Sequence, residues 1–154
     1  MLTMFVYGTL KRGERNHERF CTGALRVEEG AVRGEVYDLP LFDYPELIVP
    51  EESVRAFGTD DYAGDAELQD RLACERSLPV EGPLVFGEIF YFDDPGFRLP
   101  AIDRLEGFDP ADASSQYRRV LLPVEAEEGR VLLAWAYAVR EPSGTFLPDG
   151  RWPS

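Results

Sequence analysis

The sequence predicts an α+β fold built around a curved or closed mixed β-sheet. Apolar, aromatic and β-branched runs indicate five strands, with two weaker candidates at 23–28 and 46–49. The five lie at about 2–7, 31–39, 84–92, 117–124 and 131–139. Only three short segments favour helices, at about 14–21, 65–76 and 97–106. Since strands and helices seldom alternate, the pattern does not favour a regular parallel βαβ fold.

Individual segments carry further signals along the chain. The helix at 65–76 is expected to begin with Asp65 as its N-cap and to present Leu68 and Leu72 on one face. Gly87, inside the strand at 84–92, indicates a bulge or a close backbone approach. The segment 131–139 is apolar on both faces, which is typical of a central strand or a barrel wall. The residues 52–66 are expected to form a loop.

Length and charge restrict the possible functions. The 154 residues predict one domain over 1–140, followed by an irregular C-terminal tail over 141–154. With 16 Lys and Arg against 29 Asp and Glu, the net charge of −13 argues against binding to nucleic acid or to an anionic membrane. No run approaches the ~18 apolar residues of a membrane span, and no signal peptide is evident. We therefore expect a cytoplasmic protein with Cys21 and Cys74 as reduced thiols.

A glycine turn follows the first strand directly. Tyr7, Gly8, Thr9 and Leu10 would expose backbone N–H groups at the strand's carboxyl end, where they can hold a carboxylate or an oxyanion. The spacing of Gly8 and Gly13 also suggests a P-loop, but Glu14 and Arg15 follow where Lys and Ser or Thr are required. The alternative is a plain strand-to-helix turn in which Gly8 supplies only a special backbone angle.

One carboxylate lies at an unfavourable place on a helix. Leu99, Ile102 and Leu105 form an apolar face in the segment 97–106, and Gly107 is the natural residue just after the helix end. Glu106 then meets the negative end of the helix dipole and borders the buried face, so its pKa should rise toward neutrality, as a general base or acid requires. Alternatively, Glu106 is a surface residue paired with an arginine. The candidate partners are Arg104, Arg118 and Arg119.

Other candidate sites carry weaker signals. His17 is the single histidine, so a multi-histidine metal site is excluded and no metal site is expected. The spacing of His17 and Cys21 would suit a catalytic or metal-binding pair, although such a pair is more often incidental. Tyr91, Tyr117 and Tyr137 either line a pocket or serve as core aromatics.

Four motifs, taken in order, resemble the gamma-glutamylcyclotransferase-like family, in its gamma-glutamylamine branch. The opening Tyr-Gly-Thr-Leu at 7–10 matches the family's first motif, and 34–39 with 44–45 matches its Gly-x-x-Tyr-Asp-Leu and Tyr-Pro segment. The segments 85–90 and 102–108 resemble the family's Gly-Glu strand and its Asp-x-x-Glu-Gly motif, and Tyr117 opens a Tyr-x-Arg. The segment 52–82 is longer than in compact members, and forms an insertion or a lid.

The resemblance implies a small mixed β-barrel with flanking short helices and an enzyme that releases 5-oxoproline from γ-glutamyl compounds without a cofactor. It implies Glu106 as the general base and acid, with Tyr7, Gly8, Thr9, Leu10 and Tyr117 binding a small-molecule substrate. The acidic surface mildly favours a cationic leaving group such as lysine. Two alternatives are a non-catalytic binding protein on the same fold and an amide hydrolase in which Glu106 activates water.

Overall fold

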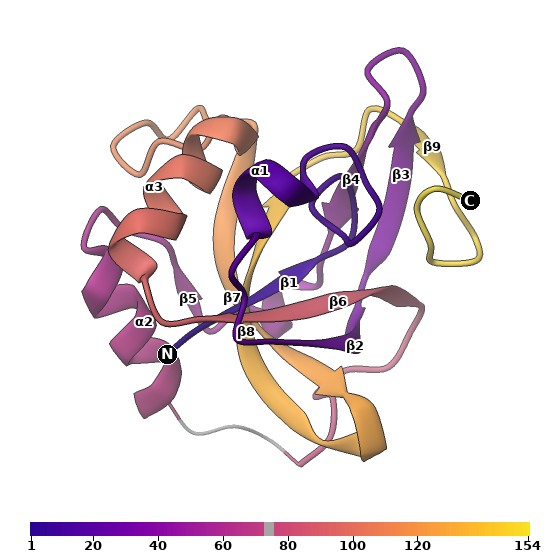
Figure 1. Ribbon diagram of the computed structural model, residues 1–154. Coiled ribbons are helices and arrows are strands. Elements are labelled where there is room, and N and C mark those ends of the chain that lie inside the picture. The colour runs from indigo at the N-terminus through magenta and orange to yellow at the C-terminus, as the bar shows by residue number, and fades with distance from the viewer. Residues whose placement is uncertain (73–75) are drawn as a thin grey trace.

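Five strands close into a barrel in the computed structural model, which describes residues 1–72 and 76–154 (Figure 1). Around the barrel they follow the order β2 (Arg26–Arg33), β6 (Leu84–Phe92), β1 (Leu2–Val6), β8 (Val131–Val139) and β7 (Tyr117–Ala126). Pairing of β2 with β7 closes the ring, and the short β5 (Ala56–Phe57) extends the sheet beside β7. Only β1 and β8 run parallel, so the predicted α+β barrel with a mixed sheet is confirmed.

The barrel brings strand β6 very close to the end of β1. A Cβ atom added to Gly87 would lie 2.2 Å from the carbonyl oxygen of Val6, so only glycine fits at this position. The close approach predicted from Gly87 is therefore present. It lies immediately before the loop that follows β1.

A second, three-stranded sheet lies beside the barrel. It contains β4 (Tyr44–Ile48), β3 (Glu35–Leu39) and β9 (Thr145–Phe146). The prediction of one strand over 31–39 is wrong in one respect, because the strand breaks at Gly34. There φ is +156°, and an added Cβ would lie 2.4 Å from the Ile48 carbonyl oxygen. Its first part belongs to β2 in the barrel, and its second part is β3. The weaker strand candidates at 23–28 and 46–49 overlap the start of β2 and the end of β4.

The tail 141–154, expected to be irregular, contributes β9 and anchors its end on the second sheet. Trp152 is buried, and its indole N–H donates a hydrogen bond of 2.9 Å to Asp38. Backbone hydrogen bonds from Leu147 to Val36 and from Phe86 to Gly150, at 2.9 and 2.8 Å, hold the same segment, although its richness in proline and glycine alone favours irregular structure.

Three short helices flank the barrel, with α2 and α3 on the side opposite the three-stranded sheet (Figure 1). They are α1 (His17–Cys21), α2 (Tyr62–Arg71) and α3 (Pro95–Glu106). Helix α1 begins later than the expected residue 14. Helix α2 begins earlier than expected, because Asp61 and not Asp65 is its N-cap and accepts a hydrogen bond of 3.0 Å from the Gly64 N–H.

The remaining differences concern the segment around α2. The helix ends at Arg71, and the part of the expected continuation that falls on 73–75, Cys74 included, lies outside the described residues. The segment 52–66, expected as a loop, contains a 3₁₀ turn at Glu51–Ser53 and strand β5 before the helix begins. In the described part of the chain, no helix is long and apolar enough to cross a membrane.

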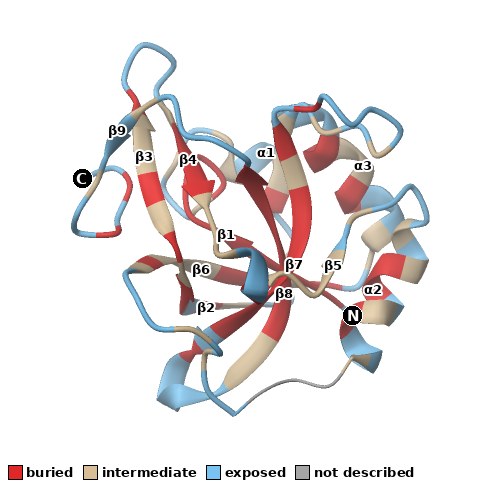
Figure 2. Cartoon of the chain, turned by 180° about the vertical axis from the view of Figure 1, so that it is seen from behind, coloured by how far each residue is buried: buried red, intermediate tan, exposed pale blue. Residues whose placement is uncertain are grey.

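Side chains alternate along the strands between two buried clusters, and the barrel strands are largely buried (Figure 2). On β8 the small residues Ala134 and Ala136 face the barrel interior, whereas Trp135 and Tyr137 pack with residues of the helices. On β1, Phe5 likewise faces inward. This double burial explains why the segment 131–139 is apolar on both faces, and it places Tyr137 next to α3.

Candidate active site

The loop after β1 presents backbone N–H groups that are free to bind a ligand. Tyr7, Thr9 and Leu10 are buried, and the Tyr7 hydroxyl donates a hydrogen bond of 2.6 Å to the Tyr137 carbonyl. Within the described residues, the N–H groups of Gly8, Thr9 and Leu10 donate to no other protein atom. Because buried amides normally have partners, this row of three is a place for an anion.

Neighbouring residues hold this loop in shape. Asn16 donates from its backbone to the Thr9 carbonyl and from its side chain to the Thr9 hydroxyl, both at 3.0 Å. His17 Nδ1 lies 3.0 Å from the Leu10 carbonyl oxygen. A Cβ on Gly8 would come within 2.7 Å of the Pro45 ring, so Gly8 is required by this contact and not by a positive φ. The expected special backbone angle at Gly8 is therefore absent.

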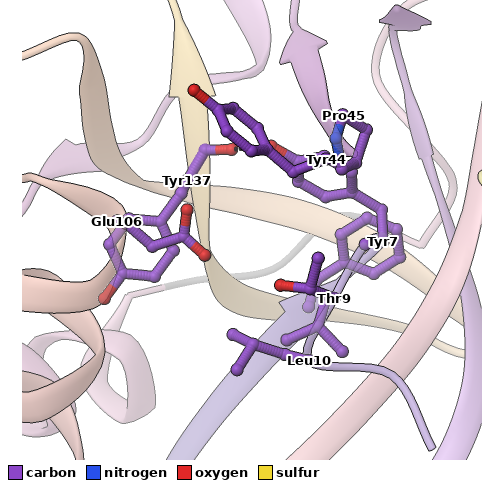
Figure 3. A pocket seen from close by; sticks show the side chains of 10 residues that line it. Tyr7, Thr9, Leu10, Tyr44, Pro45, Glu106 and Tyr137 are labelled. Atoms are coloured by element: carbon purple, nitrogen blue, oxygen red, sulfur yellow. Dashed lines mark hydrogen bonds between the residues drawn. The ribbon is translucent and has the colours of Figure 1, made fainter. Parts of the chain in front are cut away.

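Glu106 faces this loop from the last position of α3 (Figure 3). The helix ends there because Gly107 adopts the left-handed conformation, with φ +70° and ψ +28°, and Phe108 N–H bonds back to the Asp103 carbonyl at 2.9 Å. Glu106 is half-buried, and its carboxylate makes no hydrogen bond or ion pair with any described residue. It lies among the pocket-lining side chains shown in Figure 3.

None of the three arginines considered as partners pairs with Glu106. Arg119 is fully buried and bound to other carboxylates, and the Arg118 guanidinium lies 5.3 Å from the ring centre of Phe57. Arg104 is exposed on α3 and lines a different hollow. The surface ion pair considered as the alternative for Glu106 is therefore not present in this structure.

The environment of Glu106 favours its protonated form. Burial, and then the negative charge of Asp103, raise the pKa of the Glu106 carboxyl to about 7. Burial also raises the pKa values of Tyr7, Tyr117 and Tyr137 well above the ordinary value, so these hydroxyls stay neutral. A carboxyl that titrates near neutral pH is suited to both taking and giving a proton.

A buried charge network lies behind Glu106. Arg119 donates to both carboxylate oxygens of Asp103, at 2.9 and 3.2 Å, and to Asp65 at 2.8 Å. The Tyr137 hydroxyl donates to the same Asp103 oxygen as the Arg119 Nε, at 2.5 Å. One cation between two carboxylates leaves a net negative charge, and Asp103 precedes Glu106 by three residues, on the same face of the helix. Sequence reasoning missed this network, although the three-residue spacing was a signal for it.

Two adjoining hollows meet at Glu106. The inner pocket contains about 370 Å³ of empty space, a volume that includes open solvent. It is lined by Phe5, Val6, Tyr7, Gly8, Thr9, Leu10, Tyr44, Pro45, Glu106 and Tyr137. The outer pocket contains about 700 Å³ on the same measure, and shares Thr9, Tyr44 and Glu106 with the inner one. The structure thus brings the loop after β1 and Glu106 together in one place.

The other candidate residues have different surroundings. Tyr117 lines only the outer pocket, and its hydroxyl already donates to the Pro45 carbonyl at 2.7 Å. Tyr91 donates to Glu28, away from both pockets. Cys21 is buried, and burial raises its pKa to about 12, so the thiol is inert. In the described ranges, no group of three or more His, Cys, Asp or Glu side chains is placed to hold a metal ion.

Residues 4–73 and 71–154 match the family model described as gamma-glutamyl cyclotransferase, AIG2-like. The chain is 29% identical over 130 residues to gamma-glutamylaminecyclotransferase from Homo sapiens, covering 84% of this chain and 66% of that protein. For the protein of the same name from Bos taurus, identity is 28% over 146 residues, covering 94% and 71%. The chain thus spans about two thirds of the length of these relatives.

Solved structures share the fold. YkqA from Bacillus subtilis superposes with a TM-score of 0.61 at 18% identity, over 98% of this chain and 39% of that one. An AIG2-like protein from Mus musculus superposes with a TM-score of 0.57 at 23% identity, over 93% and 80%.

Proposed function

Because the chain belongs to the gamma-glutamyl cyclotransferase, AIG2-like family, we propose that it is a cyclotransferase. It releases 5-oxoproline from a γ-glutamyl amine or a γ-glutamyl amino acid. The observation that carries the proposal is an unpaired carboxyl, Glu106, facing three free backbone N–H groups across one pocket. The names of the human and bovine relatives support an amine as the leaving group.

The substrate's own atoms supply nucleophile and electrophile. The N–H groups of Gly8, Thr9 and Leu10 hold the α-carboxylate of the glutamyl group. Glu106 takes a proton from the α-ammonium, the freed amine attacks the γ-carbonyl, and a C–N bond of the five-membered lactam forms. As the original amide C–N bond breaks, Glu106 returns the proton to the departing nitrogen, and the second proton of the attacking nitrogen passes to the released amine, so that the lactam and an ammonium ion are the products. Both steps need one carboxyl that exchanges protons near neutral pH, which agrees with its pKa of about 7.

The pocket contributes by holding the glutamyl chain curled. Well-oriented intramolecular reactions reach effective molarities of about 10⁵ M or more, so positioning alone accounts for much of the rate. The aromatic side chains of Tyr7, Tyr44 and Tyr137 line the pocket in which the amine attacks. The reaction needs no cofactor, since nucleophile and electrophile belong to one molecule.

Product analysis tests the proposal. The purified protein is incubated with a panel of γ-glutamyl amines and γ-glutamyl amino acids, and 5-oxoproline and glutamate are measured by mass spectrometry. We expect 5-oxoproline from the wild type and from Glu67→Gln, an exposed carboxylate of α2 used as the matched control, and none from Glu106→Gln. Glutamate in its place would identify a hydrolase. If neither product forms but the γ-glutamyl compounds raise the Tm of the protein, the protein binds these ligands without catalysis.

A further inference from the structure

A groove between α1 and α3 leads away from the outer pocket. It is lined by Arg19, Phe20, Phe97, Arg98, Ala101, Arg104 and Leu105. Leu105 belongs to the lining of both hollows, so the groove adjoins the outer pocket at this side chain. Figure 1 shows α1 lying beside α3, and Arg98 ties them together by donating to the Phe20 carbonyl at 3.1 Å.

Helical spacing gives the groove its direction. On α3, Leu105, Ala101 and Phe97 recur every four residues and form one stripe. On α1, Arg19 follows Asn16 by three residues, and Asn16 lines the outer pocket. The groove therefore runs along both helices away from Glu106, and one helical turn from Leu105 to Ala101 covers about 6 Å.

The groove is basic, although the protein is strongly acidic. Arg19 and Arg104 are exposed and form no ion pair with any described residue, whereas Arg98 is held by Asp94 at 3.0 Å. None of its lining residues is acidic. Charges beyond ~10 Å are screened at physiological salt, so the local arginines, and not the net charge of −13, determine which ligand charge is attracted here.

The outer pocket does not reverse the preference of the groove for a negatively charged group. Its arginine, Arg15, is bound to the Asp43 carboxylate at 3.0 Å, and its single acidic lining residue is Glu106. In the proposed reaction Glu106 is occupied by the reacting nitrogens. The rest of the leaving group therefore passes the polar side chains of the outer pocket first. It then reaches the groove, where Arg19 and Arg104 lie beside apolar side chains.

Resting on the proposed function, we propose that this groove binds the distal end of the leaving group and selects γ-glutamyl amides whose amine portion ends in a carboxylate. An aliphatic spacer lies along Leu105 and Ala101, and the carboxylate is placed between Arg19 and Arg104. The overall composition favours a cationic leaving group, whereas the groove favours a leaving group with a negatively charged distal end.

Three substrates with the same γ-glutamyl group and similar chains test the inference. They are the γ-glutamyl amides of 6-aminohexanoate, hexylamine and cadaverine, which end in a carboxylate, a methyl group and an ammonium. For the wild type we expect kcat/KM to fall in that order. The spread should be smaller at 0.5 M salt, because the Debye length shortens from ~8 Å at 0.15 M to roughly 4 Å. Arg19→Gln and Arg104→Gln should each lower the ratio of carboxylate to methyl substrate by about 2–5-fold, the range for exposed ion pairs.

The control is Arg71→Gln, which removes the same charge from an exposed position on α2. It should leave that ratio at the wild-type value, and thermal melts check that all three variants fold. Release of 5-oxoproline with equal kcat/KM for the three compounds, or a ratio insensitive to both groove substitutions, would overturn the inference while leaving the proposed function intact. Absence of 5-oxoproline from all three compounds, with release from another γ-glutamyl substrate of the panel, would refute the inference alone, whereas absence from the whole panel would refute both.

Discussion

Replacing Glu106 with glutamine is expected to stabilise the fold at pH 8 while removing turnover. The wild-type carboxyl has no partner among the described residues, and its pKa lies at about 7 in place of the ordinary 4.5. At pH 8 the folded protein must therefore hold a charge that its surroundings disfavour. Glutamine has the shape of the neutral acid and avoids that cost at every pH.

The size and the pH range of the effect follow from proton linkage. Between pH 4.5 and about 7 the folded state binds more protons at Glu106 than the unfolded state, so the free energy of unfolding decreases as the pH rises. A difference of about 2.5 pKa units, at 1.36 kcal/mol each, corresponds to an upper value of about 3 kcal/mol. The stabilisation is present below pH 4.5 and is lost as the pH passes through 7. For a chain of this length, 3 kcal/mol corresponds to about 6–12 °C in Tm.

Urea unfolding of wild type and Glu106→Gln at pH 5 and pH 8 measures this difference directly. The variant should exceed the wild type at pH 8 by about 2–3 kcal/mol, and by much less at pH 5. Glu67→Gln, exposed on α2, should differ from the wild type by less than about 0.5 kcal/mol at both values. An equal advantage of Glu106→Gln at both pH values, or none at either, would refute the assignment of a neutral-pH carboxyl.

Three further predictions concern activity and the supporting network. Below pH 7, kcat/KM should fall about tenfold per pH unit, because the base form of Glu106 is lost; a flat profile between pH 5 and 8 would contradict its role. Gly8→Ala should raise KM about tenfold or more, since its Cβ would meet the Pro45 ring at 2.7 Å and displace the loop; unaltered substrate titrations would argue against the amide cradle. Asp103→Asn should lower the free energy of unfolding by about 1–3 kcal/mol, because it weakens the hydrogen bonds to Arg119. It should also move the acidic limb of the kcat/KM profile to lower pH, because the charge of Asp103 raises the pKa of Glu106. Loss of stability with an unmoved limb would limit Asp103 to a structural role.

Local rules were sufficient for the elements whose signals lie within a few residues. Gly107 indicated where α3 ends, and so placed Glu106 in its last turn. The break at Gly34 could not be predicted in the same way, because the residues on both sides favour strand. What bends the chain there is the carbonyl of Ile48, fourteen residues away, which approaches too closely for any side chain.

The same distinction applies to the site. The exposed N–H groups after β1 follow from a glycine turn at a strand's end, and were predicted from a few consecutive residues. The buried network was not, because Arg119 meets Asp65 across 54 positions and Asp103 across 16. Asp65 was expected to be an N-cap, since a lone aspartate before an apolar helical pattern usually is one. Its burial beside Arg119 is a property of the tertiary fold.

The pKa of Glu106 depends on where the nearby cations are held. Arginine is charged at any accessible pH, so one guanidinium in contact with Glu106 would restore an ordinary carboxylate and end its usefulness as a proton carrier. Arg119 is held by two carboxylates and by the Thr59 carbonyl at 2.9 Å, and Arg15 is held by Asp43 at the rim of the outer pocket. Carboxylates that line neither pocket thus keep the site's central carboxyl unpaired. A large acidic excess is therefore compatible with a site built around one neutral-pH glutamate.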